Sequence, residues 1–439
     1  MAKLTFMGGI HPFDGKKMSK DKPIKKVLPK GDLVYPLSQH IGAPAICIVK
    51  KGDHVLVGQK IAEANGFVST NIFASVSGTV KTIELRRVIS GGMEECIIIE
   101  NDGLYEEIAY PNVKPYEDMT KEEIIQAIKE AGVVGMGGAG FPTHVKLSPK
   151  EPEKIDRVIA NCAECEPYLT SDYRRMIEEP EKIISGLKVV LSLFDHAKGI
   201  IAIENNKMDC VKIMKELIVN EPNISVKVLK TKYPQGSERH LIYATTGRSL
   251  NSKMLPCQVG CIVDNVDTLC AISRGVIERR PLIYRTVTVT GNAIRKPQNF
   301  EICIGTNYGE LIEEAGGFRK DPEKIISGGP MMGVALCSEN VPTTKISSAL
   351  LCMVEDEVSK KEESACIHCG RCVEVCPGRI LPSMLDVLAR NNNRDAFLAN
   401  NGMECCECGC CSYVCPAKRQ LTQTIRSYRR MELNNRKKK

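Results

Sequence analysis

Tryptophan is absent from this 439-residue chain, and all aromatic residues together make up only 5% of it. The cores of its domains must therefore be mainly aliphatic, and a chain of this length predicts about three domains or more. No run of about 18 apolar residues occurs, so a membrane-spanning helix is not expected. Residues 1–30 lack the charged, apolar and small-residue blocks of a secretory signal, which predicts a soluble protein that stays in the cytosol.

A strong excess of one charge is also missing, because the net charge is only +7. The visible basic excess lies at the end of the chain, at Arg426, Arg429, Arg430, Arg436, Lys437, Lys438 and Lys439. A solvated terminus is the simplest interpretation of this run, and contact with anionic lipid head groups or an acidic partner is the alternative. Nucleic acid is not expected as a partner.

Cysteine, in contrast, is abundant, with 21 residues. In a chain without a secretory signal, this number argues against a disulfide scaffold and favours thiolate–metal chemistry. Eight cysteines form two copies of the motif C-x2-C-x2-C-x3-C-P: Cys366, Cys369, Cys372 and Cys376, then Cys405, Cys408, Cys411 and Cys415. In such a run three thiolates bind one [4Fe–4S] cluster, and the fourth, before the proline, reaches the other cluster.

The repeated motif therefore predicts two [4Fe–4S] clusters with crossed ligation. The first takes Cys366, Cys369, Cys372 and Cys415; the second takes Cys405, Cys408, Cys411 and Cys376. Zinc is the alternative metal, but tetrahedral zinc sites gain nothing from the proline-terminated run. The repeat register excludes Cys406 and Cys410. A helical stripe between the two motifs favours an α-helical ferredoxin.

A second unusual stretch, residues 131–146, reads A-G-V-V-G-M-G-G-A-G-F-P-T-H-V-K. Its glycines allow the backbone to approach a ligand closely, at an entropic cost in the unfolded chain. The preceding residues 120–128 combine a capping box with helical spacing, so we expect a helix that stops at Gly132. A site for a phosphate or a flat ring and a flexible hinge are both open interpretations of this loop. It is not a Rossmann fingerprint, because no strand precedes it.

The remaining patterns predict a multidomain α/β chain. Short strands broken by Ser and Gly in the first hundred residues resemble the barrel-sandwich hybrid of lipoyl and biotinyl carriers, but residues 65–71 contain no lysine to modify. Alternating strands and helices follow, and then a strand–strand–helix pattern typical of a β-grasp domain. We expect a barrel-sandwich hybrid at 1–115, an α/β domain at 116–280, a β-grasp (SLBB-like) domain at 281–349, a dicluster ferredoxin at 350–425 and a basic tail at 426–439.

Two iron–sulfur clusters carry electrons one at a time and need a donor or acceptor. A flavin is the cofactor that converts a two-electron hydride into single electrons, and this requirement favours the glycine loop as a flavin site.

The loop from Gly135 to Thr143, with Lys146, resembles the FMN loop of the NADH-oxidising flavoprotein subunit of respiratory complex I. Three further segments follow in the same order: N-C-A-E-C-E-P at 161–167, Y-P-Q-G-S-E at 233–238 and D-N-V-D-T at 264–268. The complete module order resembles the C subunit of the Rnf complex, a membrane-bound, ion-pumping ferredoxin:NAD⁺ oxidoreductase.

The resemblance implies an enzyme subunit on the cytoplasmic face of the membrane, held there by its partner subunits, one of them an iron–sulfur subunit. It would exchange hydride between NAD(H), its substrate, and FMN, and pass electrons through its clusters. The FMN residues implied are Gly135, Gly137, Gly138, Gly140, Lys146, Asn161, Glu164, Tyr233, Gly236, Glu238, Asp264, Asn265 and Thr268. Phe141 would stack on the dinucleotide and Glu166 would accept hydrogen bonds from its ribose.

The chain departs from the complex I pattern at Met136, Ala163 and Ser237, where the pattern has an arginine, an acidic residue and a second glutamate. Its doubled cluster motif also differs from the single cluster of that flavoprotein. Two other functions stay open from sequence: a flavin-free docking subunit, and a cobalamin-reducing flavin iron–sulfur protein. The glycine loop and clusters argue against the first, and the N-terminal position of the sandwich argues against the second.

Overall fold

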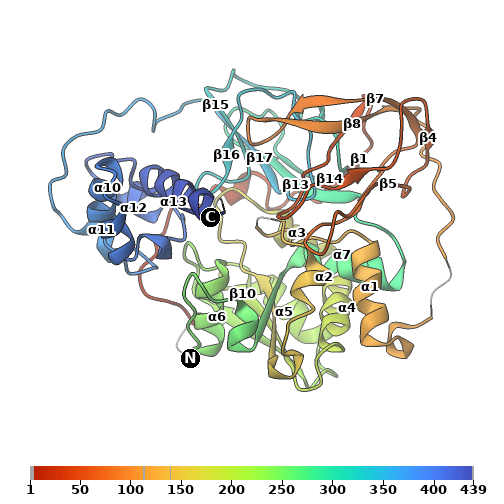
Figure 1. Ribbon diagram of the computed structural model, residues 1–439, viewed down its shortest axis with the longest axis horizontal. Coiled ribbons are helices and arrows are strands. Elements are labelled where there is room, and N and C mark those ends of the chain that lie inside the picture. Colours follow the sequence, from red (N-terminus) through yellow and green to blue (C-terminus); the bar gives the residue numbers. More distant parts are fainter. Residues whose placement is uncertain (1–3, 112–113, 139, 438–439) are drawn as a thin grey trace.

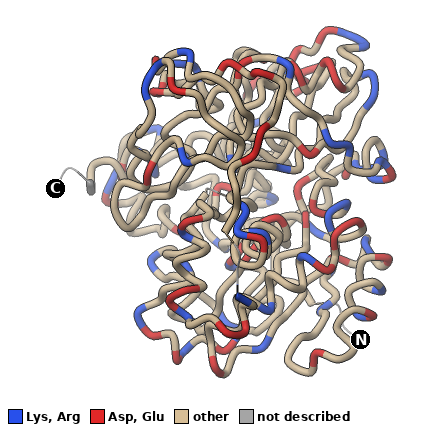
Figure 2. The backbone as a smooth tube through the Cα atoms, turned by 90° about the vertical axis from the view of Figure 1, so that its right-hand side faces the viewer, with Lys and Arg blue, Asp and Glu red and all other residues tan. Residues whose placement is uncertain are grey.

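The computed structural model describes residues 4–111, 114–138 and 140–437. An α/β domain and a helical domain lie beside each other, and two β-rich domains lie above the α/β domain (Figure 1). Short 3-10 helices occur at Lys16–Met18, Tyr116–Asp118, Pro152–Lys154, Pro256–Val259 and Gly402–Glu404. Charged residues of both signs are interspersed along the face in Figure 2. None of the helices in the described part of the chain is long and apolar enough to cross a membrane.

The α/β domain is built on a four-stranded parallel sheet of order β11-β10-β9-β12. Its strands are β9 (Arg157–Cys162), β10 (Lys198–Glu204), β11 (Ile224–Leu229) and β12 (Cys261–Asn265). Its helices are α1 (Lys121–Glu130), α2 (Thr143–Lys146), α3 (Ser171–Glu178), α4 (Pro180–Leu191), α5 (Met208–Leu217), α6 (Glu238–Thr246) and α7 (Val266–Ile277). The alternation of strands and helices expected from sequence is confirmed.

Both faces of this sheet are covered. Buried residues of α1, α4, α5 and α7 share one aliphatic core with β9 residues such as Val158, whereas α6 packs through Leu241 and Ile242 on the opposite face. The chain runs from β9 outward to β11 and returns through α6 to β12. The strand order therefore reverses between β9 and β12, the position at which doubly wound sheets bind ligands.

The N-terminal module contains two antiparallel sheets, β2-β8-β7-β4 and β3-β5-β6. Their strands are β2 (Leu33–Pro36), β3 (Ile46–Cys47), β4 (His54–Val55), β5 (Lys60–Glu63), β6 (Ile72–Phe73), β7 (Gly78–Arg87) and β8 (Met93–Asn101). Residues 65–71 form the connection between β5 and β6, where a carrier domain would present its lysine. The barrel-sandwich fold expected from sequence is confirmed.

The β-grasp domain is a six-stranded sheet of order β1-β14-β13-β17-β15-β16 with helix α8 (Tyr308–Glu314). Its strands are β1 (Ile24–Val27), β13 (Tyr284–Thr290), β14 (Gln298–Cys303), β15 (Lys324–Ser327), β16 (Val334–Ala335) and β17 (Ala349–Met353). Strand β1 lies within the range assigned from sequence to the sandwich, and it pairs in parallel with β14. The expected boundary at 349/350 falls inside β17, so we propose that the domain ends after Met353.

The C-terminal domain is helical, with α9 (Arg371–Glu374), α10 (Pro382–Arg390), α11 (Arg394–Ala399), α12 (Cys410–Val414) and α13 (Leu421–Lys437). The two cysteine motifs repeat in backbone conformation as well as in sequence. His368, Gly370 and Arg379 have positive φ angles, and so do Glu407, Gly409 and Lys418, each 39 positions later. The same offset relates Cys366 to Cys405, which supports the register that leaves out Cys406 and Cys410.

A buried lysine joins three of the domains. The Lys345 side-chain nitrogen donates hydrogen bonds to the carbonyl oxygens of Asn71 (2.6 Å) in the sandwich and Gly132 (2.7 Å) at the end of α1, and this side chain is only 1% exposed. Its third acceptor is the Thr70 hydroxyl at 3.3 Å. Burial lowers the pKa of Lys345 from 10.5 to about 7.

This lysine gives a pH-dependent stability prediction. In the window from about pH 7 to 10.5 the folded chain holds Lys345 neutral while the unfolded chain keeps it protonated. Stability of the native chain relative to a Lys345→Met variant should therefore rise with pH through this window, by up to about 1.4 kcal/mol per unit. Thermal unfolding midpoints of both chains, measured by circular dichroism at pH 7, 8 and 9, report this difference in stability.

Lys51→Met is the matched control, because Lys51 is exposed. Its midpoint should follow that of the native chain at all three pH values. A constant difference between native and Lys345→Met chains from pH 7 to 9 would show that this ammonium keeps its ordinary protonation in the folded state.

Candidate functional site

The glycine loop lies where β9 and β12 end. Asn161 at the end of β9 pairs with Asn265 at the end of β12, and both strands point their carboxyl ends toward the loop. Asn265 also caps α7, because its side-chain oxygen accepts a hydrogen bond from the Asp267 N–H. The site is therefore formed by rigid strand ends and by a helix N-terminus, whose free N–H groups favour anions.

Contacts hold each end of the loop in place. Gly132 ends α1 with a φ of 67°, as expected from the sequence, and the Gly135 N–H donates to the Phe141 carbonyl at 2.8 Å. The Met136 N–H donates to the Thr268 hydroxyl at 2.9 Å. These contacts favour a preformed binding loop over a flexible hinge.

Three glycines of the loop have different surroundings. A Cβ on Gly137 would lie 2.8 Å from the Asn265 Cβ, and one on Gly140 would lie 2.8 Å from the Ile346 Cγ2. A Cβ on Gly138 meets no heavy atom of the described chain within 4 Å. Gly137 and Gly140 thus serve protein packing, whereas Gly138 faces open space.

Lys146 and Asp264 form an ion pair below the loop. The Lys146 ammonium donates to the Asp264 carboxylate at 2.9 Å and to the Val263 carbonyl at 2.7 Å. Burial alone lowers the pKa of Lys146, but attraction from Asp264 and then Glu238 outweighs it and raises that pKa. The other oxygen of Asp264 is buried without a hydrogen-bond partner among the described residues. The pair therefore retains hydrogen-bonding capacity for a ligand.

The segment with Gly236 closes another side of the site. The Asn161 amide donates to the Gly236 carbonyl at 2.8 Å, and the Gly236 N–H donates to the Cys165 sulfur at 3.2 Å. Glu238 lies in the first turn of α6 and is exposed, and Phe141 is half-buried. These contacts bring the 161–165 and 233–238 segments together, as their order in the resemblance implies.

Glu164 is occupied by the protein itself. It has a φ of 45°, and its carboxylate accepts hydrogen bonds from the Asp172 and Tyr173 N–H groups at the start of α3. Lys16 lies 3.5 Å from the same carboxylate and donates to the carbonyls of Glu164, Glu166 and Leu169. Sequence reasoning missed Lys16, because no motif marks a lysine that acts about 150 positions away.

Glu166 also contacts protein rather than open space. One of its oxygens accepts hydrogen bonds from the N–H groups of Met331 (2.7 Å) and Met332 (3.1 Å) in the β-grasp domain. Burial raises the pKa of Glu166 to about 7. In this structure Glu166 thus joins two domains. That Glu166 accepts hydrogen bonds from a ribose stays a prediction, and its second carboxylate oxygen would have to accept them.

Tyr233 points toward the helical domain. Its hydroxyl, on a side chain 2% exposed, donates to the Cys408 carbonyl at 2.7 Å. Cys165, Met331, Cys406 and Cys410 pack around the same contact. Tyr233 therefore connects the segment beside the glycine loop with the second cysteine motif.

A buried ion network, also missed from sequence, fixes the α/β domain to the β-grasp domain. Arg175 donates to Asp267 at 3.0 Å and to Glu301 at 3.2 Å, and Arg285 donates to the other oxygen of Asp267 at 2.6 Å. Asp267 is also the residue whose N–H donates to the Asn265 side chain at the start of α7. The network therefore orients the start of α7 beneath the glycine loop.

The two cysteine motifs lie close to each other. Burial, followed by the nearby thiols of Cys405 and Cys376, raises the pKa of the Cys411 thiol to about 12. Cys372 packs with Cys411 and Cys415. Within the described residues no three metal-binding side chains are gathered into one group.

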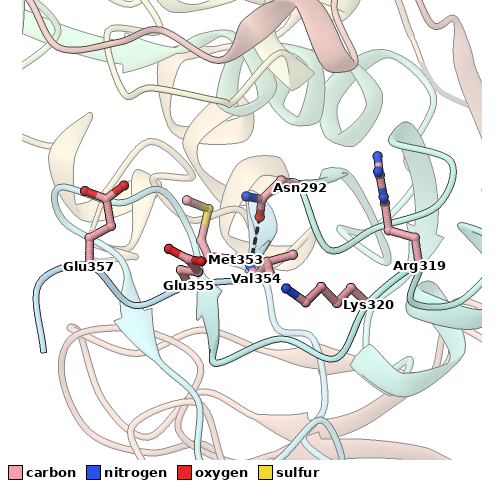
Figure 3. Close-up of a pocket in the computed structure, with 7 residues that line it drawn as sticks. All are labelled: Asn292, Arg319, Lys320, Met353, Val354, Glu355 and Glu357. Carbon is pink, nitrogen blue, oxygen red and sulfur yellow. Dashed lines mark hydrogen bonds between the residues drawn. The ribbon is translucent and has the colours of Figure 1, made fainter. Parts of the chain in front are cut away.

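An open pocket of about 460 Å³ lies elsewhere, on the β-grasp domain (Figure 3). It is lined by Asn292, Arg319, Lys320, Met353, Val354, Glu355 and Glu357. The Asn292 side chain accepts a hydrogen bond from the Val354 N–H at 2.8 Å. None of the site residues inferred from sequence lines this pocket, and its charges are of both signs.

The fit of an FMN can be tested on these contacts. Gly138 leaves open space for a ring or phosphate, the start of α7 supplies N–H groups, and Lys146 supplies a cation beside the unpartnered oxygen of Asp264. Backbone, cation and carboxylate groups of this kind suit phosphate and ring-edge recognition. The residues present therefore fit the group.

Comparisons with known families match four parts of the chain. The descriptions are an RnfC barrel sandwich hybrid domain at 4–104, a Nuo51 FMN-binding domain at 128–274, an SLBB domain at 286–335 and a 4Fe-4S binding domain at 360–381. Together with the fold and the site, these matches define an oxidoreductase of the flavin iron–sulfur class. The fold class expected from sequence is confirmed.

Two curated relatives cover nearly the whole chain. The C subunit of the Na⁺-translocating ferredoxin:NAD⁺ oxidoreductase complex of Acetobacterium woodii is 44% identical over 437 residues, 99% of this chain and 98% of that protein. The C subunit of the proton-translocating complex of Clostridium ljungdahlii is 44% identical over 427 residues, 96% of this chain and 93% of that protein. The chain belongs to the RnfC family, the C subunits of ion-translocating ferredoxin:NAD⁺ oxidoreductase (Rnf) complexes.

Among solved structures, an NAD⁺-reducing [NiFe]-hydrogenase in the H₂-reduced state gives a TM-score of 0.48 at 19% identity. That match covers 65% of this chain and 55% of the other.

Proposed function

We propose that this chain is the NAD(H)-reacting subunit of an Rnf-type complex. It exchanges hydride between NAD(H) and an FMN bound at the glycine loop, and it passes single electrons through two [4Fe–4S] clusters. The observation that carries the proposal is the Tyr233–Cys408 hydrogen bond of 2.7 Å, because it places the second cysteine motif against the segment that closes the flavin site.

Each set of residues has a distinct task. Gly138 leaves room for the flavin, Lys146 and the start of α7 attract its negative charge, and Asn161 and Asp264 offer polar contacts. Phe141, half-buried beside the loop, offers an aromatic face to the dinucleotide. Bound FMN supplies the chemistry that converts hydride into single electrons, and the protein supplies binding, orientation and exclusion of water.

Two clusters with crossed ligation agree with the contacts of the cysteines. Cys376 and Cys405 pack against one hydrophobic cluster, and Cys372 packs with Cys411 and Cys415 of another. We assign Cys366, Cys369, Cys372 and Cys415 to one cluster and Cys405, Cys408, Cys411 and Cys376 to the other. The Tyr233 contact makes the second of these the cluster nearer the flavin.

We further propose that the chain is peripheral and is held on the cytoplasmic face of the membrane by the other subunits, including an iron–sulfur subunit. The match to an FMN-binding domain supports an enzymatic role over a flavin-free docking role. The near-complete coverage of Rnf relatives supports this complex over a cobalamin-reducing one.

The function can be tested with the isolated chain after anaerobic loading with FMN and iron–sulfur clusters. Added NADH should bleach the flavin in stopped flow and then reduce the clusters, without any membrane subunit, because the dinucleotide site lies within this chain. The same preparation without FMN is the control and should not react. A folded, FMN-loaded chain that NADH cannot bleach would make it a relay or docking subunit.

A further inference from the structure

The helical domain contains two copies of one loop, and only one of them is covered. Positions 405–411 repeat positions 366–372 in sequence and in the sign of φ, with an offset of 39 residues. The later copy is docked inside the molecule: Cys408 is 8% exposed and Cys410 is fully buried. Related loops thus lie in different environments.

The docked loop is held by two other domains. Tyr233 donates to the Cys408 carbonyl, and a Cβ on Gly409 would lie 3.2 Å from the Met331 side chain of the β-grasp domain. Just before the loop, Glu404 accepts hydrogen bonds from Arg239 and from the Ser252 N–H of the α/β domain. This loop is therefore the electron-transfer face turned toward the flavin site.

The earlier copy faces outward. Ile367, the counterpart of Cys406, is 65% exposed, and the ligand cysteine Cys369, the counterpart of Cys408, is exposed. His368, Gly370 and Arg371 are exposed as well, and within the described part of the chain no ion pair of Arg371 is present. The helical domain lies at one side of the molecule (Figure 1), and residues 367–371 of this loop are all exposed.

We infer that the surface formed by Ile367, His368, Cys369, Gly370 and Arg371 docks an iron–sulfur protein of the complex, in the way that the later loop docks on the flavin domain. An exposed isoleucine beside a cluster ligand supplies an apolar contact, and Arg371 favours a partner with carboxylates around its own cluster. The inference rests on the proposed function and adds to it the surface at which electrons leave or enter this chain.

The test measures binding of the loaded chain to the membrane complex lacking this subunit. Ile367→Glu and Arg371→Glu should each weaken binding at least about tenfold and slow electron transfer to the complex. Neither should change the reduction of flavin and clusters by NADH in the isolated chain. Val219→Glu, at a residue 77% exposed on the α/β domain, is the matched control and should bind as the native chain does.

Native binding and native onward transfer in both loop variants would overturn the inference. Self-association of the native chain through this loop would also overturn the inference. In that case Ile367→Glu would turn a dimer into a monomer without affecting binding to the complex, and the occupant of the surface would be a second copy of this chain. If NADH fails to reduce even the native isolated chain, the proposed function fails, whereas the binding comparison still decides the docking surface.

Discussion

Replacing Cys376 by alanine should stop electron transfer at the flavin. The cysteine before Pro377 is expected to reach across to the cluster of the second motif, and it packs against the same hydrophobic cluster as Cys405. This cluster is the one beside Tyr233, so its loss interrupts the path from the flavin. NADH should still bleach the flavin, while reduction of the remaining cluster and of any partner falls to background.

Two control variants make this result specific. Cys366→Ala should remove the outer cluster only, so NADH should still reduce the cluster of the second motif, as electron paramagnetic resonance will show. Cys406→Ala should retain the full iron content, because the repeat register leaves it out. Loss of a cluster from Cys406→Ala would show that the register is wrong, and an unreduced second-motif cluster in Cys366→Ala would reverse the proposed order.

Replacing Gly138 by valine should remove bound FMN without unfolding the loop. A Cβ at this position meets open space rather than protein, so the branched side chain would occupy the volume that the ligand needs. Steric overpacking of about 1–3 kcal/mol corresponds to a dissociation constant that is larger by about fivefold to about 160-fold. Fluorescence titration with FMN measures it, and the iron content should stay native.

Gly137→Ala is the informative companion variant. Its Cβ would lie 2.8 Å from Asn265, so it should disturb the loop itself and lower thermal stability, which Gly138→Val should not do. If the Gly138→Val variant still bound stoichiometric FMN, the flavin would lie away from this glycine.

Local features of the chain were readable from sequence because they depend on residues close together. The capping box at Thr120 and Glu123 and the end of α1 at Gly132 are both present. The same holds for the spacing of cluster cysteines, since short separations fix which thiolates can meet at one cluster. Among the candidate site residues named by the resemblance, Lys146 contacts Asp264. Asn265 and Thr268 both lie against the glycine loop.

Contacts between distant segments could not be read in this way. Strand β1 completes the β-grasp sheet from within the range assigned to the sandwich, because pairing with β14 depends on how two domains pack. Glu166 bonds to the Met331 and Met332 N–H groups 165 and 166 positions away, although its motif implied a ribose contact.

The sequence by itself determined the module order, and it predicted the cluster ligands and the flavin loop from short spacings and local backbone preferences. Only the tertiary structure decided which cysteine loop is buried against Tyr233 and which is exposed at Ile367. The two loops share the spacing of their cysteines and one glycine, so this spacing does not show which of them the other domains cover. Packing of domains far apart in the chain therefore decides which of the two cysteine loops lies against Tyr233.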